Sequence, residues 1–446
     1  MKISGFLLIS RGSAEVTWEY DGIKKEIFDE HLKMWDVFRD PVTGLYCDSE
    51  KIDSGRRCGR WGNLYNQGAT GWGLQVNCIE VELGIRTREE GIKRSLQTIQ
   101  SFKNWPRDPC TGMFSRFTSR KWQFSGEWAT IGSALATSGM MFAGNYFGGE
   151  VLEEARKLLD VSAYDRTVVA NDSISIMMVA DGDDTMSATN AALSEYAALA
   201  YLAAVTEDSE VDTKCAQFHE KFHTSINGAD PAGMAEHGRP DRFDYFGHDV
   251  ISGPYGPYST FTPLFAWLSN RALRVGEENK AFWKNALNNW YLSELDSFEE
   301  FNSDPDQVMW SLGNNATDRG EPVNIHGKVF GCGAGSSAGG YEATTMKNNE
   351  LKTYSPHIMM AFLRVVDDGA KVDINDKIEY LWTTKAGRSR KEWGLFKEKQ
   401  ADFLWRNSLL NPELQINRVE AVDYGSGLVG YAANFLPDSW FEQFMI

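Results

Sequence analysis

The sequence has no stretch that approaches the roughly 20 consecutive apolar residues of a membrane-spanning helix. Its first residues, MKISGFLLIS, carry one lysine and a hydrophobic run far shorter than the core of a signal peptide. We therefore expect a cytoplasmic protein that does not act at a membrane, or a periplasmic or secreted one if the natural N-terminus is truncated here.

Positive charge is also scarce. The chain holds 45 Lys and Arg against 62 Asp and Glu, a net charge of -17, and it has no basic run. Because phosphate backbones and anionic lipids are bound by clustered cations, nucleic acid is excluded as an expected partner. A neutral substrate fits this charge well, and oligomeric state is left open.

The six cysteines form no CxxC pair and no zinc-type spacing. Cys47 and Cys58 flank one loop and would be able to pair in an oxidising compartment. We expect free thiols and no metal centre.

Aromatic residues, in contrast, are abundant: 15 Trp, 16 Tyr and 25 Phe make up 13% of the chain. A large core accounts for many of them. The others would suit a cleft lined with flat rings, against which the weakly apolar C–H faces of sugars can lie. Composition alone favours the core.

Helical periodicity recurs along the chain. One face of a helix near 27–38 is apolar, and Thr87 with Glu90 forms a capping box before a second amphipathic helix. Residues 128–147 and 188–205 are apolar on every face, which predicts helices that are buried all round. Further helices are expected near 70–84, 150–160, 213–226, 260–273, 278–298, 355–366, 375–385, 401–409 and 426–444.

About twelve helices of two kinds indicate two concentric layers, with inner helices buried and outer helices exposing a polar face. We therefore predict an all-α (α/α)6 toroid, one domain over 1–446 with an N-terminal extension at 1–22. Short strands are expected at 15–20 and 174–180. Long connections would gather at one mouth and build a site; they span 40–70, 105–127, 163–187, 228–259 and 299–352.

Two motifs imitate known sites. "HEKFH" at 219–223 matches the HExxH zinc pattern, but the continuation of one zinc family fails at Ile226 and Ala229, so an ordinary outer helix is the preferred interpretation. "GCGAGSSAGGYEA" lacks the flanking strand, the helix and the Lys-Ser/Thr of a phosphate loop. It is interpreted as an active-site loop ending in Tyr341 and Glu342, and no cofactor is expected.

The segment "ADGDDT" places Asp181, Asp183 and Asp184 between a long loop and an apolar helix that contains Glu195. The aspartates could complement the helix dipole, hold a cation or act in catalysis. An EF-hand is excluded because Met186 stands where its glycine is needed.

Other carboxylates lie beside apolar helices. Glu127 directly precedes the helix at 128–147, and we expect it to cap that helix or to share a cleft with Arg116, Trp122 and Trp128. Asp423, in "EAVDYGSG", is another candidate.

Several segments in order resemble the glycoamylase-like (α/α)6 proteins, a group that includes bacterial β-1,2-glucanases. They are "FRDPVTGLYCDS", "GATGWGL", "WPRDPCTGMFSRFT", "GEWATIGSALATSGMMFAGNYFGGEV", "GAGSSAGGYEA" and "AVDYGSGLVGYAANFLP", and the likeness covers roughly 27–440. The resemblance implies a hydrolase or transglycosylase of β-linked glucans, β-1,2-glucan favoured, that typically inverts and needs no cofactor. Inversion requires a protonated carboxyl for the leaving oxygen and a carboxylate to activate water.

The carry-over of functional residues is uneven. Glu127 matches the family's acidic residue, but the family's aspartate five residues later is Gly132 here, and its "GYNEA" glutamate aligns with Ala191. Asp183, Asp184 or Glu195 would then replace the usual acid.

We expect Glu127 and Asp184 to be the catalytic pair, with Asp183 raising the proton affinity of its neighbour. Glu195 and Asp423 are further catalytic candidates. The substrate-binding candidates are Trp61, Trp72, Trp122, Tyr255 and Tyr341, which would stack on sugars, and Arg116, His248 and Glu342, which would hydrogen-bond them.

Two alternatives remain. The same fold could house a polysaccharide lyase or sugar epimerase, although the negative net charge disfavours a uronate polymer; its proton shuttles would be Tyr245, His248, Tyr255 and Tyr258. The chain could also be a glycan-binding protein that has lost catalysis, an interpretation that Gly132 and Ala191 support.

Overall fold

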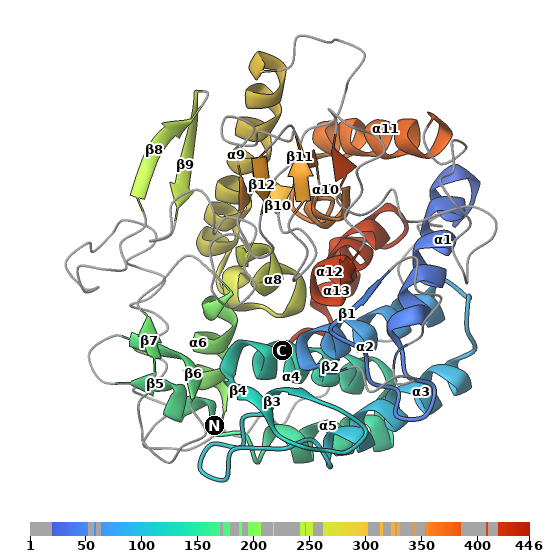
Figure 1. The fold of residues 1–446 in the computed structure, drawn as a ribbon, viewed down its shortest axis with the longest axis vertical. Helices are drawn as coiled ribbons and strands as arrows, with labels where there is room; N and C mark the ends of the chain where they lie inside the picture. The colour runs from blue at the N-terminus through green and yellow to red at the C-terminus, as the bar shows by residue number, and fades with distance from the viewer. Residues whose placement is uncertain are drawn as a thin grey trace.

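The computed structural model describes most of the helical framework (Figure 1). The described residues are 20–51, 58, 64–169, 173–178, 187–189, 195–206, 217, 241–245, 247–252, 262–301, 313–314, 323–325, 328–330, 343–344, 353–354, 356–384, 407–408 and 418–446. The strand expected at 15–20 and the helix expected at 213–226 lie almost wholly outside them.

The described helices are of two kinds. Amphipathic helices with an exposed face are α1 (Gly22–Phe38), α3 (Arg88–Phe102), α5 (Gly149–Leu159), α9 (Glu277–Phe301) and α11 (Asp368–Thr384). Helices buried on nearly every side are α2 (Gln67–Glu82), α4 (Thr130–Phe147), α6 (Tyr196–Val205), α8 (Thr262–Ser269), α10 (Pro356–Phe362) and α12 (Ala421–Tyr431). The two kinds alternate from α1 to α6 and again from α8 to α12.

The six buried helices form a closed inner ring. In chain order each contacts the next, from α2 through α4, α6, α8 and α10 to α12, and α12 returns to contact α2. In Figure 1, α3 and α5 lie along the lower edge, α9 and α11 at the top and α1 at the right, so the amphipathic helices form the outer layer. The predicted (α/α)6 toroid is confirmed.

Glycine lets neighbouring inner helices approach closely. A Cβ on Gly139 of α4 would lie 2.2 Å from the Gly71 carbonyl oxygen of α2, and one on Gly430 of α12 would lie 2.3 Å from Ala361 Cα of α10. The first turns of neighbouring helices also contact each other, as Gly68 of α2 does with Val422 of α12. The four helices α2, α4, α10 and α12 therefore run parallel, with their N-termini at one end of the ring.

Two predicted helices show their sequence signals directly. In α1 the expected apolar face is buried, including Phe28, Trp35 and the imidazole of His31. The capping box at the start of α3 is present, with the Thr87 hydroxyl accepting from Glu90 N and the Glu90 carboxylate accepting from Thr87 N.

Short strands lead into the inner helices. The larger sheet runs β2-β3-β4-β6-β5, with β7 also on β6. Its strands are β2 (Tyr65–Asn66), β3 (Ser115–Thr118), β4 (Ser125–Ala129), β5 (Val168–Val169), β6 (Ser173–Met178) and β7 (Ser187–Thr189). The remaining strands form pairs: β1 (Ser49–Lys51) with β16 (Arg418–Glu420), β8 (Asp241–Tyr245) with β9 (His248–Ser252), β10 (Gly313–Asn314) with β13 (Ala343–Thr344), β11 (Val323–Ile325) with β12 (Lys328–Phe330), and β14 (Thr353–Tyr354) with β15 (Asn407–Ser408).

Several boundaries correct the sequence-based expectations. The helix expected at 188–205 begins only at Tyr196, and Glu195 is its N-cap rather than an interior residue, because 187–189 pairs with β6 as a strand. The connection expected at 105–127 contains β3 and most of β4. Residues 407–408, expected in a helix, form β15.

The expectation of free thiols is wrong for one pair. Cys47 and Cys58 form a disulfide with a Cα–Cα distance of 5.5 Å. Their backbones are brought together because both N–H groups donate to the end of α1, at the carbonyls of Phe38 and Val37. The free thiols within the described ranges are Cys78 and Cys110.

Ion pairs attach the C-terminal helix to the rest of the protein. Arg364 and Arg274, 0% and 3% exposed, both lie 2.9 Å from the carboxylate of Asp438, in the short helix α13 (Asp438–Glu442). Burial raises the pKa of Asp438, but the two guanidinium groups outweigh it and lower the pKa to about 2. The Arg364 guanidinium also lies 3.9 Å from the centroid of the Phe441 ring.

Within the described ranges, no helix is both long and apolar enough to cross a membrane.

Candidate active site at the N-terminal end of the inner ring

Four carboxylates stand at or just before the starts of inner helices. Glu127 lies in β4, three residues before α4, while Glu195 and Glu420 are the N-cap residues of α6 and α12 and Asp423 stands in the first turn of α12. Helix N-termini carry partial positive charge, so this end of the ring favours negative groups. We call this end of the ring, marked by Glu127, Glu195, Glu420 and Asp423, the site mouth.

Glu127 and Arg116 form an ion pair in this mouth. Arg116 Nη1 lies 2.9 Å from Glu127 Oε1, and the side chains are 32% and 20% exposed. The pair joins β3 to β4, which are neighbouring antiparallel strands of the sheet. The structure thus brings together two residues that were expected to share a cleft and leaves both reachable from solvent.

Gln67 fills the space in front of Gly132. Its amide Nε2 donates to Ala129 O at 3.5 Å and its Oε1 accepts from Ser133 Oγ at 3.1 Å. A Cβ on Gly132 would lie 2.6 Å from Gln67 Nε2. The position where the resembling family carries an aspartate is therefore closed here by an amide from α2, a contact that the sequence did not reveal.

Asp48 ties the starts of α2 and α12 together. Its carboxylate accepts from Asn66 Nδ2 at 2.8 Å, and Asn66 Oδ1 in turn caps α2 by accepting from Ala69 N at 3.1 Å. The Asp48 carbonyl accepts from Ala421 N at 2.8 Å, at the start of α12. Asp48 directly follows the disulfide cysteine Cys47, so the disulfide anchors this junction.

Two predicted site residues are buried in the wall of the ring. Trp72 is 1% exposed and its ring lies 6.0 Å from that of Phe265, so a packing role is favoured over the expected stacking on sugar. Asp423 is 0% exposed, so a substrate could contact it, as its predicted catalytic role requires, only if the surrounding side chains moved.

Trp122 and His248 lie in different places. Trp122, in the β3–β4 turn, has a left-handed φ of 53° and its ring lies 6.5 Å from that of Tyr65. His248 begins β9, and its Nε2 lies 2.6 Å from Asp296 Oδ2 on α9. In Figure 1 the β8–β9 hairpin lies at the upper left beside α9, whereas β3 and β4 lie below the centre of the view. The structure therefore does not bring His248 to Glu127.

The remaining predicted site residues lie outside the described residues, and their roles stay predictions. They are Trp61, Asp181, Asp183, Asp184, Tyr255, Tyr341 and Glu342, together with Ala191, Tyr258 and the motif at 219–223. Within the described part of the chain, no group of three or more His, Cys, Asp or Glu side chains could hold a metal ion.

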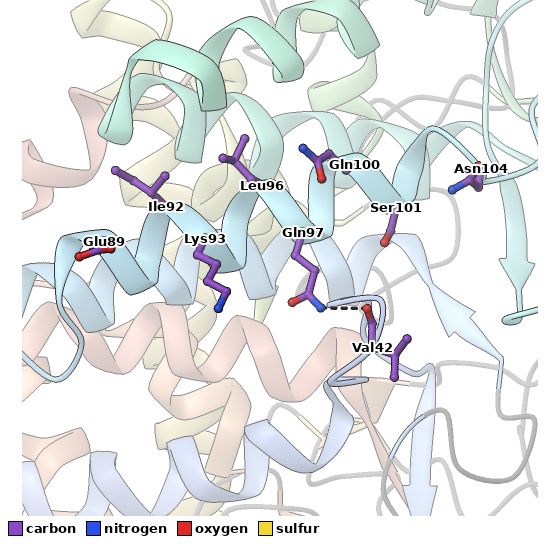
Figure 2. Close-up of a pocket in the computed structure, with 9 residues that line it drawn as sticks. All are labelled: Val42, Glu89, Ile92, Lys93, Leu96, Gln97, Gln100, Ser101 and Asn104. Atoms are coloured by element: carbon purple, nitrogen blue, oxygen red, sulfur yellow. Dashed lines mark hydrogen bonds between the residues drawn. The ribbon is translucent and has the colours of Figure 1, made fainter.

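A groove of about 610 Å³ runs along the exposed face of α3 (Figure 2). Gln97 crosses it and donates from Nε2 to Val42 O at 2.9 Å, while Ile92 and Leu96 form its apolar part. None of the mouth carboxylates lines this groove, so it is separate from the candidate site.

No protein-family model matches the chain, and no curated protein matches it by sequence. Solved structures match over nearly its full length. An endo-β-1,2-glucanase from Chitinophaga pinensis, in complex with sophorotriose and glucose, has a TM-score of 0.65 at 14% identity and 94% coverage of both chains. A Bacteroides uniformis protein provisionally assigned as a glucoamylase has a TM-score of 0.67 at 16% identity, covering 96% of this chain and 95% of its own.

An endo-β-1,2-glucanase from Talaromyces funiculosus, in complex with sophorose, has a TM-score of 0.56 at 10% identity and covers 94% of this chain and 85% of its own. At such low identity these likenesses establish the fold. The chain is an (α/α)6 toroid with the architecture of these glucanase and glucoamylase-type structures, as its resemblance to glycoamylase-like proteins implies.

Proposed function

We propose that the protein is a glycoside hydrolase, or a transglycosylase, that acts on a β-linked glucan, with β-1,2-glucan favoured. The observation that carries the proposal is the partly exposed Glu127–Arg116 pair at the N-terminal end of a closed helical ring. Matched structures of the same fold, described as β-1,2-glucanases in complex with sugars, support this substrate class.

Hydrolysis with inversion needs two carboxyl groups with different roles. Glu127 is the partly exposed carboxylate of the pair with Arg116, and we assign it to accept a proton from the attacking water. The water oxygen bonds to the anomeric carbon as the glycosidic C–O bond breaks. A protonated carboxyl, which we assign to Asp184 with Asp183 beside it, donates its proton to the leaving oxygen.

The experiment is product analysis after incubation with linear β-1,2-, β-1,3- and β-1,4-glucans, α-glucans and a uronate polymer. Glu127→Gln and Asp184→Asn should each lower kcat by about 10²–10⁴-fold, the usual contribution of a general acid or base. The matched control is Glu153→Gln, on the exposed face of α5, which should keep wild-type activity. Full activity in either test variant would exclude that residue from the pair.

A glycan-binding protein without turnover is the second candidate. The observation that favours it is the position at Gly132, where a Cβ would lie 2.6 Å from Gln67 Nε2 and the Gln67 side chain would have to move. Oligosaccharide binding measured by calorimetry, combined with intact glycan after long incubation, would support binding alone.

We also propose that the chain matures in an oxidising compartment, in place of the cytoplasmic location first expected. The Cys47–Cys58 disulfide supports this, because such bonds persist mainly in periplasmic and secreted proteins. Isolation of the protein from its natural cell fractions, with thiols blocked at lysis, tests the proposal.

A further inference from the structure

The strand that carries Glu127 has one residue too many for a regular ladder. Between two register pairs, β3 contributes only Arg116 while β4 contributes both Gly126 and Glu127. The flanking pairs are Ser115 with Trp128 and Phe117 with Ser125. This two-against-one arrangement is a β-bulge, a feature that bends a strand and changes the direction of a side chain.

Gly126 is the residue that makes the bulge possible. Its φ is +87°, in the left-handed region that side chains other than glycine adopt only at a cost. A Cβ at this position would also lie 3.3 Å from Cβ of Arg116. The backbone conformation therefore favours glycine, and a side chain at this position would press on Arg116.

The bulge lies between two fixed ends of the β3–β4 hairpin. At the tip, Arg120 Nε donates to Oδ2 of the buried Asp40 at 2.7 Å. At the base, Ala129 N donates to Phe114 O at 3.0 Å. These hydrogen bonds fix the register at both ends of the hairpin. Between them β4 has one residue more than β3, and the bulge at Gly126 accommodates it.

Gly126 and Glu127 share one opposite residue in the bulge, Arg116. A Cβ on Gly126 would lie 3.3 Å from Cβ and 3.8 Å from Cδ of Arg116, so a side chain there would press on the stem that carries the guanidinium to Glu127. Because Gly126 has no side chain, Arg116 keeps the position in which its Nη1 lies 2.9 Å from Glu127 Oε1.

We propose that Gly126 is a positioning residue: as the extra residue of the bulge, it leaves the Arg116 side chain the space in which it holds the Glu127 carboxylate. The inference rests on the proposed function, since it assigns Gly126 a part in setting the geometry of the proposed base. It also identifies the turn and bulge of the β3–β4 hairpin as the element that aligns the base.

The test compares Gly126→Ala with a variant that carries the same backbone strain elsewhere. Gly84 follows α2 with a φ of +71°, and no atom lies within 4 Å of the place that a Cβ would take there, so Gly84→Ala adds strain without touching the mouth. Both variants should lose similar thermal stability. Only Gly126→Ala should lower kcat, by about 10²-fold, the typical effect of a misplaced reacting group.

A conservative variant and a second readout separate positioning from folding. Gly126→Asn should retain more activity than Gly126→Ala, because asparagine enters the left-handed region more readily. Carbon-13 NMR titration of the glutamate carboxyls reports on Glu127 without turnover; the Glu127 signal is identified by its absence in Glu127→Gln. Its titration midpoint should move in Gly126→Ala and stay at the wild-type value in Gly84→Ala.

The outcomes are distinct. Wild-type kcat and an unmoved Glu127 titration in a folded Gly126→Ala would overturn the inference and leave the proposed function standing. If Gly126→Ala does not fold, the same comparison with Gly126→Asn decides. If the wild type cleaves no glycan, the proposed function fails, while a moved titration in Gly126→Ala would still show that Gly126 positions Glu127.

Discussion

Replacing Cys47 and Cys58 with serine should lower the stability of the protein without changing its fold. The two cysteines are 11 residues apart, and the entropy of closing a loop of that length in the unfolded chain gives about 3 kcal/mol of stabilisation. The unfolding entropy of a 446-residue chain is on the order of 0.9 kcal/mol per kelvin, so Tm should fall by about 3 °C.

Differential scanning calorimetry of the Cys47→Ser/Cys58→Ser double variant measures this change, and reduced wild-type protein provides a second form of the same perturbation. Cys110→Ser is the matched control, because this cysteine is exposed and free. Mass spectrometry of alkylated protein shows whether Cys47 and Cys58 are protected. Two reactive thiols at these positions, or an unchanged Tm in the double variant, would refute the reasoning.

Three further changes test other parts of the structure. Gly132→Ala should cost about 1–3 kcal/mol by overpacking against Gln67, and Gln67→Ala should relieve that cost in a double-mutant cycle; additive losses would contradict the contact. Asp438→Asn should cost about 3 kcal/mol, the lower end for breaking a buried pair, because Arg364 is left without its partner while Asp438 is itself 36% exposed. The pKa of Asp438 is about 2 in the folded protein and near 4 in the unfolded chain, so its contribution to the free energy of unfolding is present above pH 4 and lost as pH falls through 2. Urea unfolding at a series of pH values should show this loss of stability in the wild type and not in Asp438→Asn. Thr87→Ala should cost about 1 kcal/mol by removing the cap of α3, and a loss below 0.3 kcal/mol would argue against the capping box.

The helical framework could be predicted because its signals are local and repeat. The apolar face of α1 and the capping box of α3 are read from residues three or four positions apart. The all-round apolar character of α4 marked it as an inner helix, and the structure places it between α2 and α6 in the ring.

Features that depend on distant contacts were missed. Strands of two to five residues, such as β2 and β4, are too short for alternation to show, and Gly126 interrupts the pattern in β4. The Gln67–Gly132 contact joins two helices far apart in sequence, so no local pattern reports it. The disulfide depends on two backbone contacts with the end of α1 that spacing alone does not show.

The placement of Glu127 was partly predicted. Its position before an apolar helix indicated a site residue, and the structure pairs it with Arg116 as expected. The strand, the bulge and the positive φ of Gly126 that set this pair were not foreseen.

The most direct test of the central claim is the turnover of linear β-1,2-glucan by wild-type protein and by Glu127→Gln, followed by mass spectrometry of the products. The account predicts shortened glucose oligomers from the wild type and a loss of about 10²–10⁴-fold in rate from the variant, with equal oligosaccharide binding by both. Equal rates for the two proteins would contradict the assignment of Glu127, and intact glycan with every substrate of the panel would contradict the hydrolase itself.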